Sequence, residues 1–284
     1  MKRNVKVTCD STCDLPQKMY QERMISVIPM TVTLGEETRR DGVDVTNEEL
    51  FHYVEASGNL PKTSAISIYE FTEFFEKLVK EGSRVIHVSL SSELSSSYQN
   101  ACIAAREVGN VYVVDGRSLS TGSAHLVLLA QEMAQAGMEA AEIVEQLDQV
   151  RERLDVSFVL QTLEYLHKGG RCSGIVALGA NLMKLHPEIV VSDGKMDVGR
   201  KYRGSMEKSI LAYVRGRLEG RNDVDCKRIF VTHSGVPGEI VEKVVALIKE
   251  LQPFEEIIEA TAGSTIASHC GPGCLGVLFL KKEA

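Results

Sequence analysis

A strand followed directly by a helix, in residues 85–108, is the feature that most constrains how this chain can fold. The segment VIHVSL (85–90) is a run rich in apolar and β-branched residues, which is typical of a buried strand. From Tyr98 to Val108 apolar residues recur at helical spacing, and Gly109 marks the end of the helix. A buried strand that leads into a helix is the repeating unit of a layered α/β sheet. The chain is therefore expected to contain such a sheet.

Five serines lie between this strand and this helix. A helix that follows a strand presents free backbone N–H groups and a partial positive charge at the edge of the sheet where ligands bind. Hydroxyl groups beside it donate hydrogen bonds to an anion without carrying charge. One serine is explained as a helix N-cap, but one cap does not account for five serines. The segment predicts an anion site, for a carboxylate or a phosphate, among Ser91, Ser92, Ser95, Ser96 and Ser97.

The first half of the chain alternates strands with helices, which predicts a mostly parallel sheet with helices on both faces. Capping-box patterns mark the start of two of the helices, at 47–57 and 68–82. Extended segments are predicted at 5–10, 25–35, 85–90 and 110–115. Further helices are predicted at 16–24, 98–108, 122–137 and 138–154.

Hydroxyl-rich loops follow the predicted strands, so their side chains are expected to meet at one edge of the sheet. In the loop at 59–67, Ser67 is explained as the cap of the next helix. Thr63 and Ser64 precede that cap and have no such local explanation. They are therefore further candidates for the anion site.

The pattern changes near Leu154, which predicts two domains, residues 1–154 and 155–284. In the second domain Asp193 and Gly194 predict the tight turn of a hairpin at 188–203. Strands are also expected at 156–161, 227–234, 254–262 and near the end of the chain. Helices are expected at 162–174, broken by paired glycines, and at 175–185, 205–218 and 237–251. The second domain is thus expected to be mixed α/β.

Charge and composition exclude several classes of protein. A formal net charge of -7 argues against nucleic-acid binding, which depends on clustered Lys and Arg. The sequence has no apolar signal segment and no run near the ~20 apolar residues that cross a bilayer. Seven scattered cysteines fit reduced thiols better than a disulfide framework. We therefore expect a cytoplasmic protein without a transmembrane segment.

Two cofactor patterns are incomplete. A zinc site is conceivable from the cysteine pairs 9/13 and 270/274 with His269, but both pairs have three intervening residues instead of two. Three glycines in 271–276 match the dinucleotide fingerprint by spacing, but they precede a predicted strand where the motif requires a helix. We therefore expect no metal and no cofactor.

A serine hydrolase is the more serious enzymatic alternative, because serines, histidines and aspartates are plentiful. The chain has no G-x-S-x-G elbow, and nothing in its sequence assigns a base to a particular serine. His269 is flanked by Gly271, Pro272 and Gly273, which would allow a ligand to approach the backbone. A structural role for this histidine and a role in binding remain equally open from its sequence context.

Six motifs lie along nearly the whole chain: DSTCDLP, TSAIS, SSELSSSYQNA, VVDGRSLSTG, LHKGGRCSG and HCGPGCLGV. Together they resemble the DegV family of bacterial fatty-acid-binding proteins. The chain departs from the family pattern at Ala65–Ile66, at Ser96–Ser97 and at His186, where the family has Gln-Pro, Gly-Thr and often lysine. The positions Thr63, Ser95 and His269 match the pattern.

The resemblance implies a two-domain α/β architecture that encloses a long-chain fatty acid, such as palmitate, between its domains. It implies that Thr63, Ser95 and His269 bind the carboxylate, and that Arg171 serves a partner rather than the lipid. That partner is the catalytic subunit of a fatty acid kinase, which forms an acyl phosphate for phospholipid synthesis. The chain itself would then be a lipid-binding subunit. The alternative is a serine hydrolase or acyltransferase that uses Ser95 and His269 on acyl esters.

Overall fold

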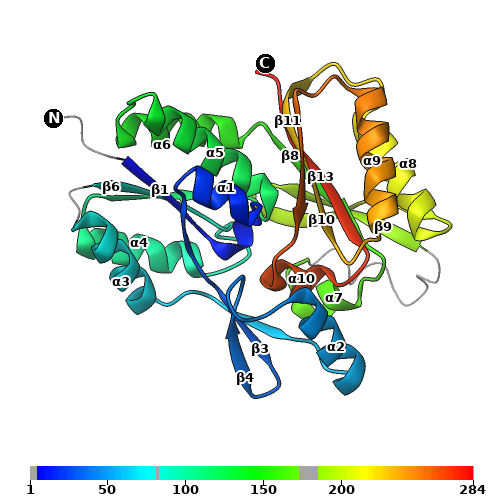
Figure 1. Ribbon diagram of the computed structural model, residues 1–284, viewed down its shortest axis with the longest axis horizontal. Helices are drawn as coiled ribbons and strands as arrows, with labels where there is room; N and C mark the ends of the chain where they lie inside the picture. Colours follow the sequence, from blue (N-terminus) through cyan, green and yellow to red (C-terminus); the bar gives the residue numbers. More distant parts are fainter. Residues whose placement is uncertain (1–4, 81–82, 173–184, 284) are drawn as a thin grey trace.

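The computed structural model describes residues 5–80, 83–172 and 185–283. Four of the described strands form a parallel sheet in the order β2-β1-β6-β7 (Figure 1). This pairing confirms the parallel sheet predicted for the first half of the chain. The strands are β1 (Val5–Asp10), β2 (Ser26–Ile28), β6 (Arg84–Ser89) and β7 (Val111–Asp115).

Helices cover both faces of this sheet, as the alternation of strands and helices predicts. Figure 1 shows α3 and α4 on one face and α5 and α6 on the other. Both predicted capping boxes form, and α3 buries Phe71 and Phe75 beneath its apolar stripe. The helices around this sheet are α1 (Gln17–Glu22), α3 (Ile68–Val79), α4 (Ser97–Val108), α5 (Thr121–Gln135) and α6 (Ala140–Arg151).

Six further described strands form a mixed sheet in the order β10-β9-β8-β13-β11-β12. In this sheet β11 and β12 pair in parallel, whereas the other pairs are antiparallel. Two helices that pack on each other, α8 (Met206–Leu218) and α9 (Gly238–Leu251), lie along one side of the sheet (Figure 1). The strands are β8 (Leu154–Val159), β9 (Leu185–Ser192), β10 (Lys195–Arg203), β11 (Val224–Ser234), β12 (Glu256–Thr261) and β13 (Cys274–Lys281).

The helix α5 lies between the two sheets. It packs against β1 and β6 of the parallel sheet and against β8 and β13 of the mixed sheet. Its residues from Thr121 to Leu128 are all buried, and all of them except His125 are apolar or small. One cluster of buried apolar side chains therefore spans both sheets, and a second cluster lies between the mixed sheet and the helices α8 and α9. Leu154 begins the mixed sheet, and the division of the chain at that residue stays a prediction.

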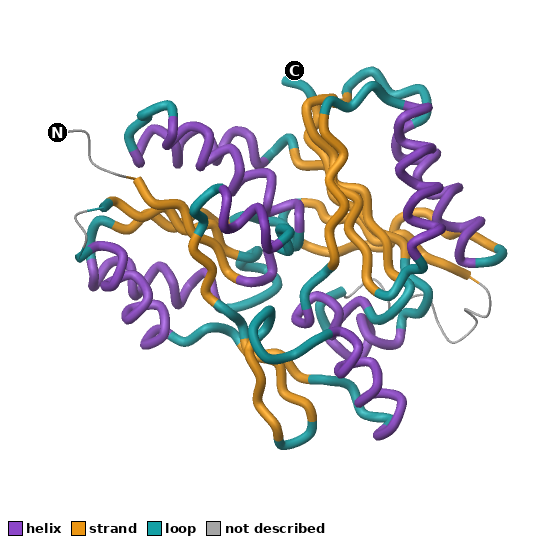
Figure 2. The backbone as a smooth tube through the Cα atoms, viewed as in Figure 1, coloured by secondary structure: helices purple, strands orange, loops and turns teal. Residues whose placement is uncertain are grey.

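The predicted loop at 59–67 is wrong in part, because Lys62–Ser64 forms a short strand, β5. This strand pairs with β3 (Thr31–Leu34), and β3 also pairs with β4 (Glu37–Arg40), so that a small sheet of three described strands projects below α1 (Figure 2). The predicted extended segment 25–35 divides accordingly into β2 and β3. Thr63 therefore comes from a separate sheet and not from the edge of the parallel sheet.

Two short helices and a hairpin complete the part that surrounds the site. As predicted, α7 (Glu164–Gly169) ends at the paired glycines, where Gly170 has a φ of 69°. The predicted hairpin turn forms between β9 and β10, with positive φ at Asp193 and Gly194. The helix α2 (Asn47–Ser57) and the short helix α10 (Ser264–Cys270) pack on each other. The helix predicted at 175–185 lies outside the described residues except for Leu185, which begins β9.

Candidate functional site

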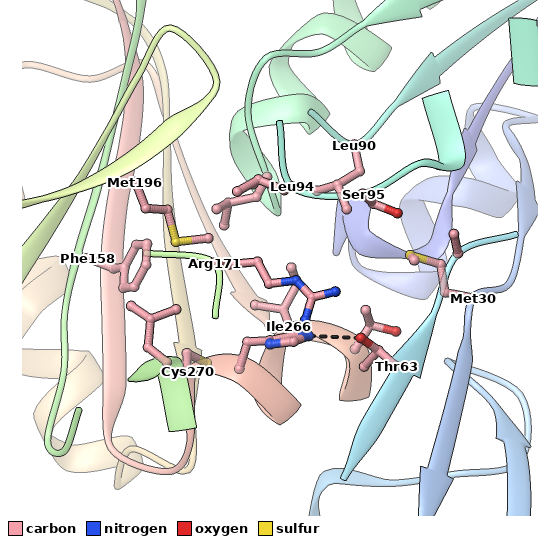
Figure 3. A pocket seen from close by; sticks show the side chains of 15 residues that line it. Met30, Thr63, Leu90, Leu94, Ser95, Phe158, Arg171, Met196, Ile266 and Cys270 are labelled. Carbon is pink, nitrogen blue, oxygen red and sulfur yellow. Dashed lines mark hydrogen bonds between the residues drawn. The ribbon is translucent and has the colours of Figure 1, made fainter. Parts of the chain in front are cut away.

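An apolar cavity lies where the parallel sheet, the mixed sheet and the small sheet meet. A few polar groups converge on it, namely Thr63, Ser95, Arg171 and His269, together with Thr265. Figure 3 shows Thr63 and Ser95 on one side of the cavity and Phe158 and Met196 on the other. This combination is typical of a ligand site. Apolar lining residues include Leu90, Leu94, Leu119, Phe158, Met196 and Ile266.

A second apolar cavity adjoins the first. The two cavities share the lining residues Leu119, Phe158, Ile266 and Cys270. The second cavity continues toward β11 and β13, where Thr232 and Leu278 line it. The apolar space is therefore elongated. Thr63, Ser95 and His269 line its first part, and the mainly apolar lining of its second part includes Ser120, Thr232 and His233.

The serine-rich segment after β6 places one serine at the cavity. Ser91 is buried and donates a hydrogen bond to the carbonyl of Gly194 in the β9–β10 turn, at 2.8 Å. Ser97 is also buried and accepts from the backbone N–H of Ile66, at 3.2 Å. Ser95 lines the cavity and lies 3.0 Å from the Ser97 hydroxyl. Of the five candidate serines, Ser95 is the one that lines the cavity, so it remains the candidate for binding an anion.

Thr63 and His269 meet across the chain. The Thr63 Oγ1 atom on β5 lies 2.8 Å from the His269 Nε2 atom on α10, and a dashed line marks this bond in Figure 3. Burial and the neighbouring Arg171 guanidinium lower the pKa of His269 from 6.5 to about 4. The imidazole is thus neutral at neutral pH, with one nitrogen that donates and one that accepts.

Gly169 allows the imidazole to lie against the end of α7. A Cβ atom at this glycine would come within 2.5 Å of the His269 Nδ1 atom. Among the described residues, Nδ1 has no hydrogen-bond partner. The sequence indicates the paired glycines only as a helix break, because nothing in the local pattern shows that a side chain 100 residues away packs there. Gly169 is therefore a site residue that sequence reasoning missed.

Arg171 lies just beyond α7, exposed to solvent and also in the wall of the cavity (Figure 3). Its Nη1 atom donates to the Gly169 carbonyl at 2.7 Å. The sequence predicts that this cation projects toward a partner and does not contact the ligand. The structure gives it access to both solvent and the cavity, so its role in partner binding stays a prediction.

The hydrogen bonds do not pair Ser95 with His269 as a nucleophile and its base. The Nε2 atom of His269 bonds to Thr63, and the hydroxyl of Ser95 bonds to Ser97. A serine hydrolase requires the base to lie within hydrogen-bond reach of the nucleophile. The geometry therefore favours a site that binds an anion over one that attacks an ester.

Features of a metal site or of a membrane-spanning helix are absent from the residues that the structure describes. Cys9, Cys13, Cys270 and Cys274 are free thiols. Within residues 5–80, 83–172 and 185–283, no group of three or more His, Cys, Asp or Glu side chains could hold a metal ion. None of the helices in these ranges is long and apolar enough to span a bilayer.

The neutral state of His269 gives a prediction for its titration. In the protein without ligand, the ring should titrate near pH 4, because burial and the Arg171 cation disfavour the imidazolium. The unfolded chain takes up this proton near pH 6.5, so the contribution of His269 to stability is lost as the pH falls from about 6.5 to about 4. NMR titration of the ring protons measures the midpoint. Replacement Arg171→Gln should raise it, and a wild-type midpoint near 6.5 would contradict this account of the site.

Comparison with known proteins identifies the family. The DegV family model, described as an uncharacterised protein family, matches residues 4–282. A DegV domain-containing protein of Staphylococcus aureus is 33% identical over 284 residues, which cover 99% of this chain and 100% of that protein.

Solved structures agree over the whole fold. A DegV family protein of Thermus thermophilus, described by its fatty acid binding, has a TM-score of 0.87 at 31% identity, covering 98% of this chain and 99% of its own. A protein of Thermotoga maritima, described as a DegV lipid binding protein, has a TM-score of 0.85 at 27% identity, covering 99% and 100%. The resemblance drawn from the sequence motifs is thus confirmed. This chain belongs to the DegV family.

Proposed function

We propose that this protein binds a long-chain fatty acid in the elongated cavity, with the carboxylate held by the polar groups of Thr63, Ser95 and His269, of which His269 orients the Thr63 hydroxyl. The observation that carries the proposal is an apolar cavity with a hydrogen-bonded Thr63–His269 pair and a serine at one end. Relatives of known structure are described as binding fatty acids or lipids, which supports the same ligand class. Phe158 and Met196, on the far side, would contact the acyl chain.

Affinity for such a ligand would come mainly from its tail. Burial of an acyl chain contributes ~0.8 kcal/mol per methylene, so a dozen methylenes supply on the order of 10 kcal/mol before the costs of association. The second cavity extends the apolar space beyond Phe158 and Ile266, which favours a long chain over a short one. The polar groups would then set the orientation of the ligand.

The head-group contacts follow from the protonation state of His269. A carboxylate taken out of water must receive hydrogen bonds. If the neutral imidazole donates from Nε2 to Thr63 Oγ1, the hydroxyl proton of Thr63 is free to point at the carboxylate. Ser95 offers a second hydroxyl donor from the opposite segment.

We further propose that the bound carboxylate is presented to the catalytic subunit of a fatty acid kinase. That subunit would transfer the γ-phosphoryl group of ATP to a carboxylate oxygen, giving an acyl phosphate and ADP. The exposed Arg171 at the cavity supports this step, because it provides a directional cation where a partner or its phosphate groups would approach.

Retention of fatty acid by head-group variants tests the binding proposal. Native mass spectrometry of the purified wild type should detect a co-purified long-chain fatty acid, and the double variant Thr63→Ala/Ser95→Ala should bind it at least about tenfold more weakly, since it loses two donors to a charged group. The neighbouring exposed hydroxyls provide the matched control, Ser64→Ala/Ser96→Ala, which should retain the ligand. Undiminished retention by the folded double variant would refute the head-group assignment.

Replacement of Arg171 tests the partner proposal. Arg171→Ala should keep a wild-type content of fatty acid and lower the rate at which the kinase catalytic subunit forms acyl phosphate. The control is Lys168→Ala, which removes an exposed cation one residue before the glycine pair. Loss of bound fatty acid, with an unchanged reaction rate for the protein that remains loaded, would assign Arg171 to the ligand instead.

A further inference from the structure

The start of α10 is attached to two buried carboxyl groups from distant parts of the chain. The backbone N–H of Gly263 donates to Asp14 Oδ1, and that of Ser264 donates to Asp41 Oδ1, both at 2.8 Å. Asp14 is 6% exposed and Asp41 is 2% exposed. These bonds satisfy two of the donors that a helix leaves free at its first turn.

The remaining oxygens of both carboxyl groups are also bonded. Asp14 accepts from the Ser120 hydroxyl at the start of α5, and Asp41 accepts from the Ser11 hydroxyl at 2.8 Å. Ser11 in turn accepts from the backbone N–H of Met30, a cavity residue, at 3.0 Å. The two carboxyl groups therefore connect α10 with the end of β1, the start of α5 and the segment before β3.

Two neighbouring carboxyl groups in the interior are energetically unfavourable, because burial and mutual repulsion disfavour their charged forms. Burial raises the pKa of Asp14, hydrogen bonds from Ser120 and Gly263 oppose that rise, and the charge of Asp41 adds to it. A hydroxyl or amide side chain would cap the helix without bringing two acids close together in the interior. The residues Ile266, His269 and Cys270 of α10 all line the cavity. The contacts that hold α10 in place therefore also bear on the geometry of the site.

We propose that Asp14 and Asp41 are positioning residues for the head-group site. The helix α10 has seven residues, too few to be stable without tertiary contacts, so its position depends on the groups that hold its first turn. His269 lies only about 7.5 Å along the helix axis from Ser264, at 1.5 Å per residue. A shift at the anchored end therefore displaces the imidazole from Thr63. This inference rests on the proposed function and gives a role to Asp14 in the DSTCDLP motif.

The test compares two ligands that differ only at the head group. Dissociation constants for palmitate and for hexadecanol are measured on delipidated protein by competition with a fluorescent fatty acid. Asp14→Leu and Asp41→Leu, made separately, should weaken palmitate binding roughly tenfold and leave hexadecanol binding within about twofold, because the tail cavity persists. The control is Glu188→Leu, which removes an equally buried acid of the mixed sheet that bonds to Arg200 and Arg217. The Glu188→Leu variant should keep the wild-type ratio of the dissociation constants for palmitate and hexadecanol, even if the variant protein is less stable.

Asp41→Asn is the second variant if the leucine variants do not fold, because it keeps an acceptor oxygen for Ser264. It should lower the preference for the acid in the same direction, by about threefold. A wild-type ratio in any folded Asp14 or Asp41 variant would overturn the positioning role while leaving the proposed function intact. Equal affinity of the wild type for palmitate and hexadecanol would overturn the proposed function and this inference together.

Discussion

The hydrogen bond between Thr63 and His269 is the interaction on which the candidate site depends. It joins residues 206 positions apart, one on a strand of the small sheet and one on a short helix that precedes the last strand of the mixed sheet. The imidazole must be neutral to fit beside Arg171, and it must lie against Gly169, where a side chain would displace it. The bond therefore determines which hydrogen-bonding groups face the ligand, and it joins the strand β5 to the helix α10 in the wall of the cavity.

The two sheets make different contributions to this site. The parallel sheet supplies the serine-rich loop after β6, at the edge where ligands bind in open α/β sheets. The mixed sheet supplies apolar wall residues such as Phe158 and Met196. Because α5 packs on both sheets, the loop and the wall share one rigid support. An elongated, mainly apolar cavity with Thr63, Ser95 and His269 in its first part follows from this arrangement.

The sequence predicts those elements whose signals are local. The strand at 85–90, the capping boxes of α2 and α3, and the Asp193–Gly194 turn all depend on residues within a few positions of each other. The family motifs assign Thr63, Ser95 and His269 to the binding of a carboxylate, and the structure brings all three residues to one cavity.

Long-range contacts were not predictable in the same way. Phe158 and Met196 have the pattern of ordinary core residues, and only the packing of two sheets makes them a cavity wall. The strand β5 is three residues long and pairs with β3, which lies far from it in the sequence. Its own sequence therefore resembles that of a loop. The contacts of Gly169 with His269 and of Asp14 with α10 depend on the final fold in the same way.

A crystal structure of the protein with palmitate tests the account most directly. The account predicts that the carboxylate lies within hydrogen-bond distance of the Thr63 and Ser95 hydroxyls, beside His269. The acyl chain should run past Leu119, Phe158 and Ile266 into the second cavity. A carboxylate next to Phe158 with the tail toward Thr63, or a fatty acid bound outside the cavity, would contradict it.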